Sequence, residues 1–135
     1  MTVQLTSALK EALVVQAEAV APHECCGLLL GTGQTITAVQ PASNVHPTPA
    51  THFEIDPATL IAAHRAARAG GPQVLGYYHS HPAGPPEPSL TDGAMAAWDS
   101  KVWAIAGRGE GGWTVRFWRA TEAGFVALPS ASTSG

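Results

Sequence analysis

A pair of histidines at the end of a buried-strand pattern is the feature that most constrains how this chain can fold. Residues 74–78 are mostly aliphatic or aromatic and are bounded by glycine and proline, which predicts a largely buried strand that continues into the histidines. Side chains two positions apart in a strand point to the same face and lie roughly 6 to 7 Å apart. His79 and His81 can therefore bind one metal ion together, while Ser80 points away.

The segment that follows the histidines predicts a rigid loop and then a helix. Prolines at positions 82, 85, 86 and 88 fix the backbone and remove N–H donors, so we expect a shaped loop. Ser89 with Asp92 three positions later is a capping box, which predicts that a helix begins there. Taken alone, this pair is most often only a helix cap. Beside two histidines, it also offers a carboxylate to a metal site.

Two imidazoles and one carboxylate form a ligand set that a hydrolytic zinc site can use. Three protein ligands leave the fourth tetrahedral position for a water, whose pKa zinc lowers to about 7. The sequence therefore predicts that His79, His81 and Asp92 converge on one zinc ion (Zn²⁺).

These residues resemble the signature of the JAMM (MPN+) metalloproteases, in which His-x-His, seven residues, Ser, two residues and Asp follow one another. That signature also requires an upstream glutamate, and Glu24 fits it in the segment Glu-Cys-Cys-Gly that precedes an apolar strand. Asn44 and residues 53–57 are similar to a segment of the small prokaryotic members. The resemblance covers roughly residues 3–120, and no signature position is missing.

The resemblance implies a role for each signature residue. His79, His81 and Asp92 would bind zinc, with a water completing the shell. Glu24 would be the general base that takes a proton from this water and passes it to the leaving amine. Ser89 would donate a hydrogen bond to the oxyanion of the tetrahedral intermediate. Without the histidine motif, Glu24 would be interpreted as a solvated acid before a strand.

Hydrophobic periodicity, caps and turn residues predict an alternation of helices and strands. We expect helices from Thr6–Ser7 to before Pro22, from Asp56–Pro57 to Gly70, and from Ser89 through Ala96, and strands over residues 28–30, 35–39, 74–78, 102–106, 113–118 and 125–128. The first two strands can form a hairpin. The pattern indicates an α/β fold with a mixed β-sheet flanked by helices, and the resemblance implies a single-domain MPN (cytidine-deaminase-like) fold. We expect this domain over residues 1–128 and a disordered tail over the small, polar residues 129–135.

Composition favours one small domain without a nucleic-acid or membrane partner. A chain of 135 residues needs neither disulfides nor a structural metal to fold, so a metal would serve function. The hydrophobic share of 45% argues against disorder, and the net charge of −3 offers no basic surface for nucleic acid or anionic membrane. No signal-peptide pattern and no apolar run near 20 residues is present, so we expect a cytoplasmic protein.

Several other residues leave alternatives open. Cys25 and Cys26 are the only cysteines and form no disulfide framework; a thiolate could join the metal, but packing of Cys26 as a small hydrophobe is favoured. We interpret His46 and His52 as surface or substrate-facing residues and not as ligands. Asn44 would order the substrate or the site loop. We expect the tryptophans in the core or on a self-association face, with ligand binding as the alternative; they are Trp98, Trp103, Trp113 and Trp118. The sequence is therefore compatible with a homo-oligomer.

The leading functional hypothesis is a zinc metallopeptidase that cuts a peptide or isopeptide bond at the C-terminal Gly-Gly tail of a ubiquitin-like or sulfur-carrier protein. An extended tail can add to a sheet edge, and small residues fit a narrow channel. The short chain favours the small prokaryotic group that trims β-grasp carriers. The alternative is a non-catalytic MPN scaffold, although silent relatives usually lack a ligand and this chain lacks none. A third hypothesis, the DNA-repair-associated group, is disfavoured because Ser80 stands where that group tends to have asparagine, and because the chain is acidic.

Overall fold

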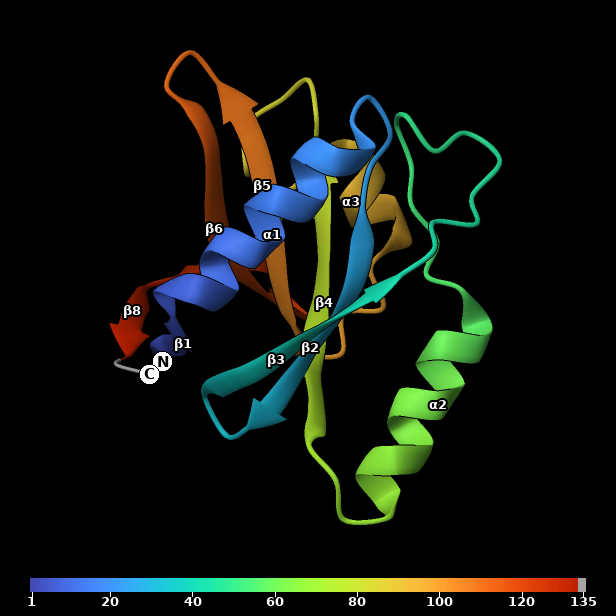
Figure 1. The fold of residues 1–135 in the computed structure, drawn as a ribbon, viewed down its shortest axis with the longest axis vertical. Coiled ribbons are helices and arrows are strands. Elements are labelled where there is room, and N and C mark those ends of the chain that lie inside the picture. The colour runs from blue at the N-terminus through green and yellow to red at the C-terminus, as the bar shows by residue number, and fades with distance from the viewer. Residues whose placement is uncertain (134–135) are drawn as a thin grey trace.

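The computed structural model describes residues 1–133, in which eight strands form one curled, mixed sheet in the order β7-β6-β5-β4-β2-β3-β1-β8 (Figure 1). The strands are β1 (Val3–Thr6), β2 (Cys26–Thr32), β3 (Thr35–Ala42), β4 (Gln73–His81), β5 (Val102–Gly109), β6 (Gly112–Thr121), β7 (Gly124–Leu128) and β8 (Ser130–Thr133). Three pairs are parallel, namely β4 with β5, β1 with β3 and β1 with β8, and the other pairs are antiparallel. The predicted mixed sheet and the hairpin of β2 and β3 are confirmed.

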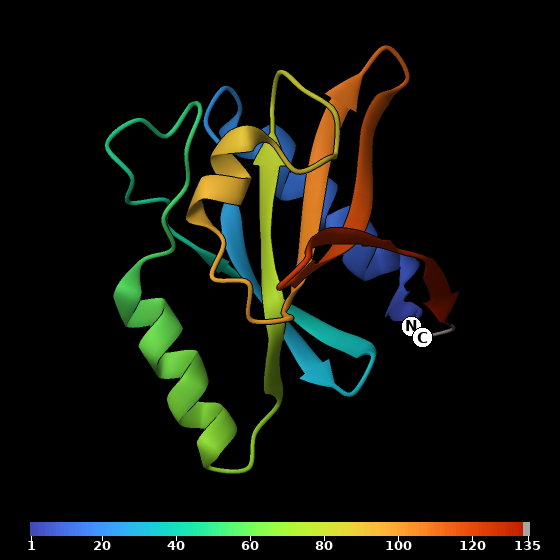
Figure 2. The same ribbon diagram turned by 180° about the vertical axis from the view of Figure 1, so that it is seen from behind.

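Helices cover both faces of this sheet. Helix α1 (Ser7–Val20) lies on one face, and α2 (Pro57–Arg68) and α3 (Leu90–Met95) lie on the other, as the views from the two sides show (Figures 1 and 2). The predicted N-caps are confirmed, because the Thr6 side chain accepts a hydrogen bond from the Leu9 amide and Asp56 accepts one from the Ala58 amide. Within residues 1–133, no helix combines the length and the apolar character that a membrane crossing requires.

The core consists of two clusters, one on each side of β4. Tyr78 faces the α1 side, where it belongs to a cluster with Leu13 of α1 and Phe117 of β6. On the other side, Tyr77 packs against a second cluster around Trp103. This alternation is the period-two pattern of a strand buried on both faces. It fixes the direction of the two histidines that end β4.

The end of the chain differs from the sequence prediction. A disordered tail was expected from residue 129, but Ser130–Thr133 form β8, which pairs in parallel with β1 from Val3↔Ser130 to Thr6↔Thr133. The prediction is therefore corrected for residues 129–133, and residues 134–135 lie outside the described residues. The prediction relied on the small polar side chains of this segment, which bury little apolar surface. The strand forms because the unpaired backbone groups at the edge of β1 can bind the backbone of an extended segment of any sequence. Strand β1 itself was also missed, because four residues directly before a helix cap give too short a pattern.

We expect removal of residues 129–135 to destabilise the protein, because it leaves the outer edge of β1 unpaired. A few strand-pairing hydrogen bonds, each worth about 0.5–1.5 kcal/mol net, predict a loss of about 1–3 kcal/mol in the free energy of unfolding. Urea denaturation measures this loss, and a control lacking only residues 134–135 keeps all of β8. Equal urea midpoints for the two shortened chains would contradict the stabilising role of β8.

Candidate metal centre

The end of β4 brings the two histidines of the motif together. His79 and His81 lie on the same side of the strand, and their Nε2 atoms are 3.1 Å apart. Strand β4 is paired on both sides, with Cys26 of β2 and Ile105 of β5 opposite His79. The backbone that carries the histidines is therefore held between two neighbouring strands.

Asp92 reaches the same point from the first turn of α3. Its Oδ1 lies 3.0 Å from His79 Nε2, and its Oδ2 lies 3.1 Å from His81 Nε2. The capping box fixes this carboxylate, because the Ser89 amide donates to Asp92 Oδ2 at 2.9 Å and the Asp92 amide donates to Ser89 Oγ at 3.0 Å. The Ser-x-x-Asp pattern is thus a helix cap and, at the same time, the means by which the carboxylate is aimed at the histidines.

These three residues can hold a metal ion. Their ligand atoms lie within 4.8 Å of one another, and two imidazole nitrogens with one carboxylate oxygen suit zinc. His81 Nδ1 donates to the Pro85 carbonyl at 2.9 Å, so that Nε2 is the ring nitrogen directed at Asp92. The His79 ring is buried and stacks on Phe53, with the two ring centroids 4.3 Å apart. Hydrogen bonding orients one ring and packing orients the other.

The charges at this site follow from burial and from the close contacts. Burial lowers the pKa of His79, against the opposing effect of Asp92, so its ring stays neutral as a metal ligand must. Burial also opposes ionisation of Asp92, but hydrogen bonds from His79 and His81 hold its pKa well below the usual range. Burial acts to lower the pKa of His81, but its hydrogen bonds to Asp92 and the Pro85 carbonyl raise it overall, so binding of a metal ion would release a proton from this ring. The ionised Asp92 carboxylate attracts a cation to the two ring nitrogens.

Glu24 lies two residues before the start of β2 and is buried, with 7% of its surface exposed. Its amide donates to the Pro49 carbonyl at 2.8 Å. Burial raises the pKa of Glu24 to about 7, an effect that His81 reduces and Asp92 reinforces. A carboxyl group with a pKa near neutrality can both accept and return a proton, which is what a general base in hydrolysis does.

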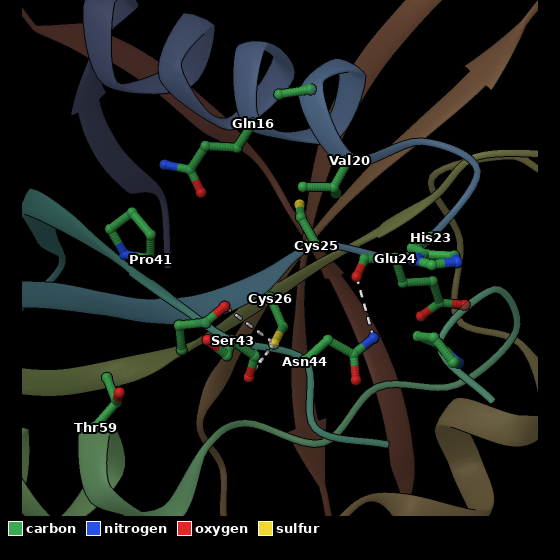
Figure 3. Close-up of a pocket in the computed structure, with 13 residues that line it drawn as sticks. Gln16, Val20, His23, Glu24, Cys25, Cys26, Pro41, Ser43, Asn44 and Thr59 are labelled. Carbon is green, nitrogen blue, oxygen red and sulfur yellow. Dashed lines mark hydrogen bonds between the residues drawn. The ribbon is translucent and has the colours of Figure 1, made fainter. Parts of the chain in front are cut away.

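Two cavities meet at Glu24. One, of about 620 Å³, is lined by residues from the end of α1, the start of β2 and the end of β3, including Gln16, Cys26 and Ser43 (Figure 3). The other, of about 350 Å³, is lined by His81, Ser89 and the loops around them. Glu24 is the residue that the two cavities share.

Ser80 and Asn44 order the segment around Glu24 through hydrogen bonds. Ser80 Oγ accepts from the Cys25 amide at 2.8 Å, which ties the residue after Glu24 to the residue between the histidines. Asn44 Nδ2 donates to the Glu24 carbonyl at 3.1 Å and to the His52 carbonyl at 2.9 Å (Figure 3). Asn44 therefore orders the loop beside Glu24, one of its two expected roles. The sequence analysis gave Ser80 no role, although a serine on the buried face of a strand is itself a signal for a hydrogen-bonded site.

The other candidate ligands lie elsewhere in the described residues. Cys26 Sγ donates to the Ala42 and Ser43 carbonyls, each at 3.7 Å, and burial raises the pKa of its thiol to about 12 (Figure 3). The His46 and His52 rings stack on each other with their centroids 4.6 Å apart. Neither the cysteines nor these histidines belong to the metal-binding group. Of the tryptophans, Trp103 is buried in the core, and the others are half-buried.

Comparison with known proteins identifies the family. A family model described as prokaryotic homologs of the JAB domain matches residues 6–121, and the chain belongs to this family. A desampylase from Haloferax volcanii is 37% identical over 103 residues, which cover 75% of this chain and 73% of that protein. A probable TtuB-protein conjugate cleaving protease from Thermus thermophilus is 42% identical over 78 residues, 58% of this chain and 52% of that protein.

Solved structures give the same fold. The solution structure of a Desulfitobacterium hafniense protein superposes with a TM-score of 0.87 at 27% identity, covering 99% of this chain and 94% of that one. A JAB1/MPN domain protein from Archaeoglobus fulgidus superposes with a TM-score of 0.61 at 18% identity, covering 96% and 98% of the two chains. The MPN-type α/β fold expected from the sequence is therefore confirmed.

The buried carboxyl of Glu24 predicts a pH-dependent effect of Glu24→Gln on the metal-free protein. A carboxyl pKa raised in the folded state means that stability falls as pH rises from about 4.5 to about 7, because over this range the unfolded chain releases the proton that the folded protein keeps. Above about pH 7 the folded protein has to ionise a buried group. Glutamine removes this cost, so we expect its melting temperature to exceed that of the wild type by about 3–8 °C at pH 8, with a much smaller difference at pH 5.

Circular dichroism melts after chelator treatment measure this difference. Glu11→Gln, at an exposed position of α1, serves as the control and should leave the two melting temperatures equal at both pH values. A Glu24→Gln effect of the same size at pH 5 and pH 8 would refute the assignment of a raised pKa.

Proposed function

We propose that this protein is a zinc metallopeptidase that hydrolyses a peptide or isopeptide bond at the C-terminal Gly-Gly tail of a ubiquitin-like or sulfur-carrier protein. The observation that carries this proposal is the convergence of His79 Nε2, His81 Nε2 and the Asp92 carboxylate, within 3.0–3.1 Å of one another, next to a buried glutamate. Similarity to a desampylase and to a probable TtuB-protein conjugate cleaving protease supports the class of substrate.

Zinc would be held by His79, His81 and Asp92. The chemistry that zinc supplies when bound is polarisation of the scissile carbonyl and a lowered pKa of water. The protein's own contribution is to hold two ring nitrogens and a carboxylate in place before the ion arrives, which the Pro85 carbonyl and the Ser89 cap support.

Glu24 would move the proton in this reaction. Its carboxylate takes a proton from the attacking water and gives it to the nitrogen of the leaving amine, which a pKa of about 7 permits in both directions. Ser89 would stabilise the developing oxyanion. Because Ser89 Oγ accepts from the Asp92 amide, its hydroxyl hydrogen stays available to donate to the substrate oxygen.

The walls around the site favour a substrate with small side chains. The cavity beside His81 and Ser89 is lined by prolines, two glutamates and several small residues, among them Ala50, Ala83 and Gly84. An extended Gly-Gly segment brings only backbone to such a surface, so that its carbonyl can approach the metal centre closely. The same segment can continue past Glu24 into the second cavity.

Cleavage of a tail-extended β-grasp carrier tests the proposed reaction. The zinc-loaded wild type should release the residues beyond Gly-Gly, as mass spectrometry detects. Glu24→Gln should lower the rate by about 10²- to 10⁴-fold, and Ser89→Ala by about 10²- to 10³-fold. Glu18→Gln, at an exposed position of α1, should cleave like the wild type. Intact carriers and intact conjugates after incubation with zinc-loaded wild type would count against the proposal.

Metal analysis separates the enzyme from the non-catalytic scaffold. We expect about one zinc per chain in the wild type and loss of that zinc in His81→Ala, because a ligand nitrogen disappears. His64→Ala, in α2 and outside the metal-binding group, should keep its zinc. Inductively coupled plasma mass spectrometry of the purified proteins measures the ratio. A folded wild type that takes up no zinc would favour the scaffold.

A further inference from the structure

The proline-rich loop, residues 82–88, contacts His81 and contains no helix or strand of its own. The Pro85 carbonyl is the partner of His81 Nδ1, at 2.9 Å. Prolines supply no N–H groups, so this loop can make few hydrogen bonds within itself. Whatever holds the loop from outside therefore also sets the position of the Pro85 carbonyl.

Donors from β5 and β6 hold the loop from outside. The Arg108 amide donates to the Gly84 carbonyl at 2.8 Å, and Arg108 Nε donates to the Pro82 carbonyl at 3.1 Å. Trp118 Nε1 donates to the Pro86 carbonyl at 3.1 Å. These three donors bind loop carbonyls on both sides of Pro85. Figure 2 shows the loop arching from the end of β4 toward β5 and β6.

Gly107 lets the loop lie directly on β5. A Cβ at this position would stand 2.2 Å from the Pro86 nitrogen and 2.4 Å from the Pro85 carbonyl carbon, both of them backbone atoms that cannot swing away. Gly107 is also the residue of β5 that pairs with His81 of β4. A side chain at position 107 would therefore displace Pro85, whose carbonyl is the partner of His81.

Ionic and aromatic contacts support the same surface. The Arg116 guanidinium lies 4.7 Å from the centroid of the Trp118 ring, and Arg116 Nη1 lies 3.4 Å from Glu87 Oε2 in the loop. These contacts keep the Trp118 ring against the loop, where its N–H can reach the Pro86 carbonyl.

We propose that Gly107, Arg108 and Trp118 are positioning residues of the metal centre. They hold the proline-rich loop on β5 and β6 so that the Pro85 carbonyl accepts the Nδ1 hydrogen of His81 and the ring keeps Nε2 directed at Asp92. This inference rests on the zinc site of the proposed function, but it does not depend on which bond that site hydrolyses. Partners that orient metal-binding histidines typically change metal affinity about 10- to 100-fold.

Gly107→Ala and Gly109→Ala form a matched pair for the first test. A Cβ at Gly107 meets the loop backbone, whereas a Cβ at Gly109, on the same strand, meets nothing within 4 Å. We expect Gly107→Ala to weaken zinc binding about 10- to 100-fold, and Gly109→Ala to bind zinc like the wild type. Competition with a chromophoric chelator measures the affinity, and thermal melts of the metal-free proteins show whether each variant is folded.

Trp118→Phe and Trp113→Phe decide the question if Gly107→Ala fails to fold. Trp118→Phe keeps an aromatic ring under Arg116 and removes the donor to the Pro86 carbonyl. Trp113, on β6 like Trp118, lies under Arg108, and Trp113→Phe serves as the control because it keeps an aromatic ring there. We expect weaker zinc binding for Trp118→Phe only. In the zinc-loaded protein, the His81 Nδ1 proton should exchange with water faster in Trp118→Phe than in the wild type, as proton NMR measures; a purely structural role would leave this exchange unchanged.

The outcomes separate this inference from the proposed reaction. Folded Gly107→Ala and Trp118→Phe proteins with wild-type zinc affinity and wild-type His81 proton exchange would overturn the positioning role, even if the enzyme cleaves its substrate. A wild type that binds zinc but cleaves no carrier would overturn the proposed reaction and leave the positioning role intact. A wild type without zinc affinity would overturn both.

Discussion

The Asp92 carboxylate is the contact on which the rest of the site depends. It lies against the Nε2 atoms of both histidines and accepts the Ser89 amide, so it joins the first turn of α3 to the end of β4. A carboxylate that is 3% exposed would be costly without such partners. Every other site residue is arranged around this junction: Ser89 by the cap, His81 by the loop between strand and helix, and Glu24 by the neighbouring strand.

The sequence revealed the parts of the site that are encoded locally. Alternation along β4 was enough to place His79 and His81 on one side, and the capping box was enough to start α3 at Ser89. Glu24 came from the family resemblance, because its position depends on the pairing of β2 with β4. The bond from the Cys25 amide to Ser80 spans 55 positions of the chain, and no local pattern predicts a contact at that separation. Strand β8 was missed for a related reason, since its partner is at the other end of the chain.

Glu24 illustrates a conflict between stability and reactivity. The folded protein buries its carboxyl group, and burial moves its pKa to about 7. The same burial that gives the group the pKa suited to the proposed general base makes its ionised form unfavourable in the metal-free fold. Ser80 and Asn44 both bind the peptide group that joins Glu24 to Cys25, because the Cys25 amide donates to Ser80 Oγ and Asn44 Nδ2 donates to the Glu24 carbonyl. The surrounding polar residues thus order the chain without neutralising the group.

The parallel pairing of β1 with β8 has a consequence for the architecture of the whole chain. Val3 and Ser130 are partners in the register, so the first and last strands of the sheet lie side by side, away from α3 (Figures 1 and 2). A short linker could close the chain into a ring, and new ends could then be opened in a surface turn far from the histidines. The order of the elements along the polypeptide could therefore be changed while His79, His81 and Asp92 stay together.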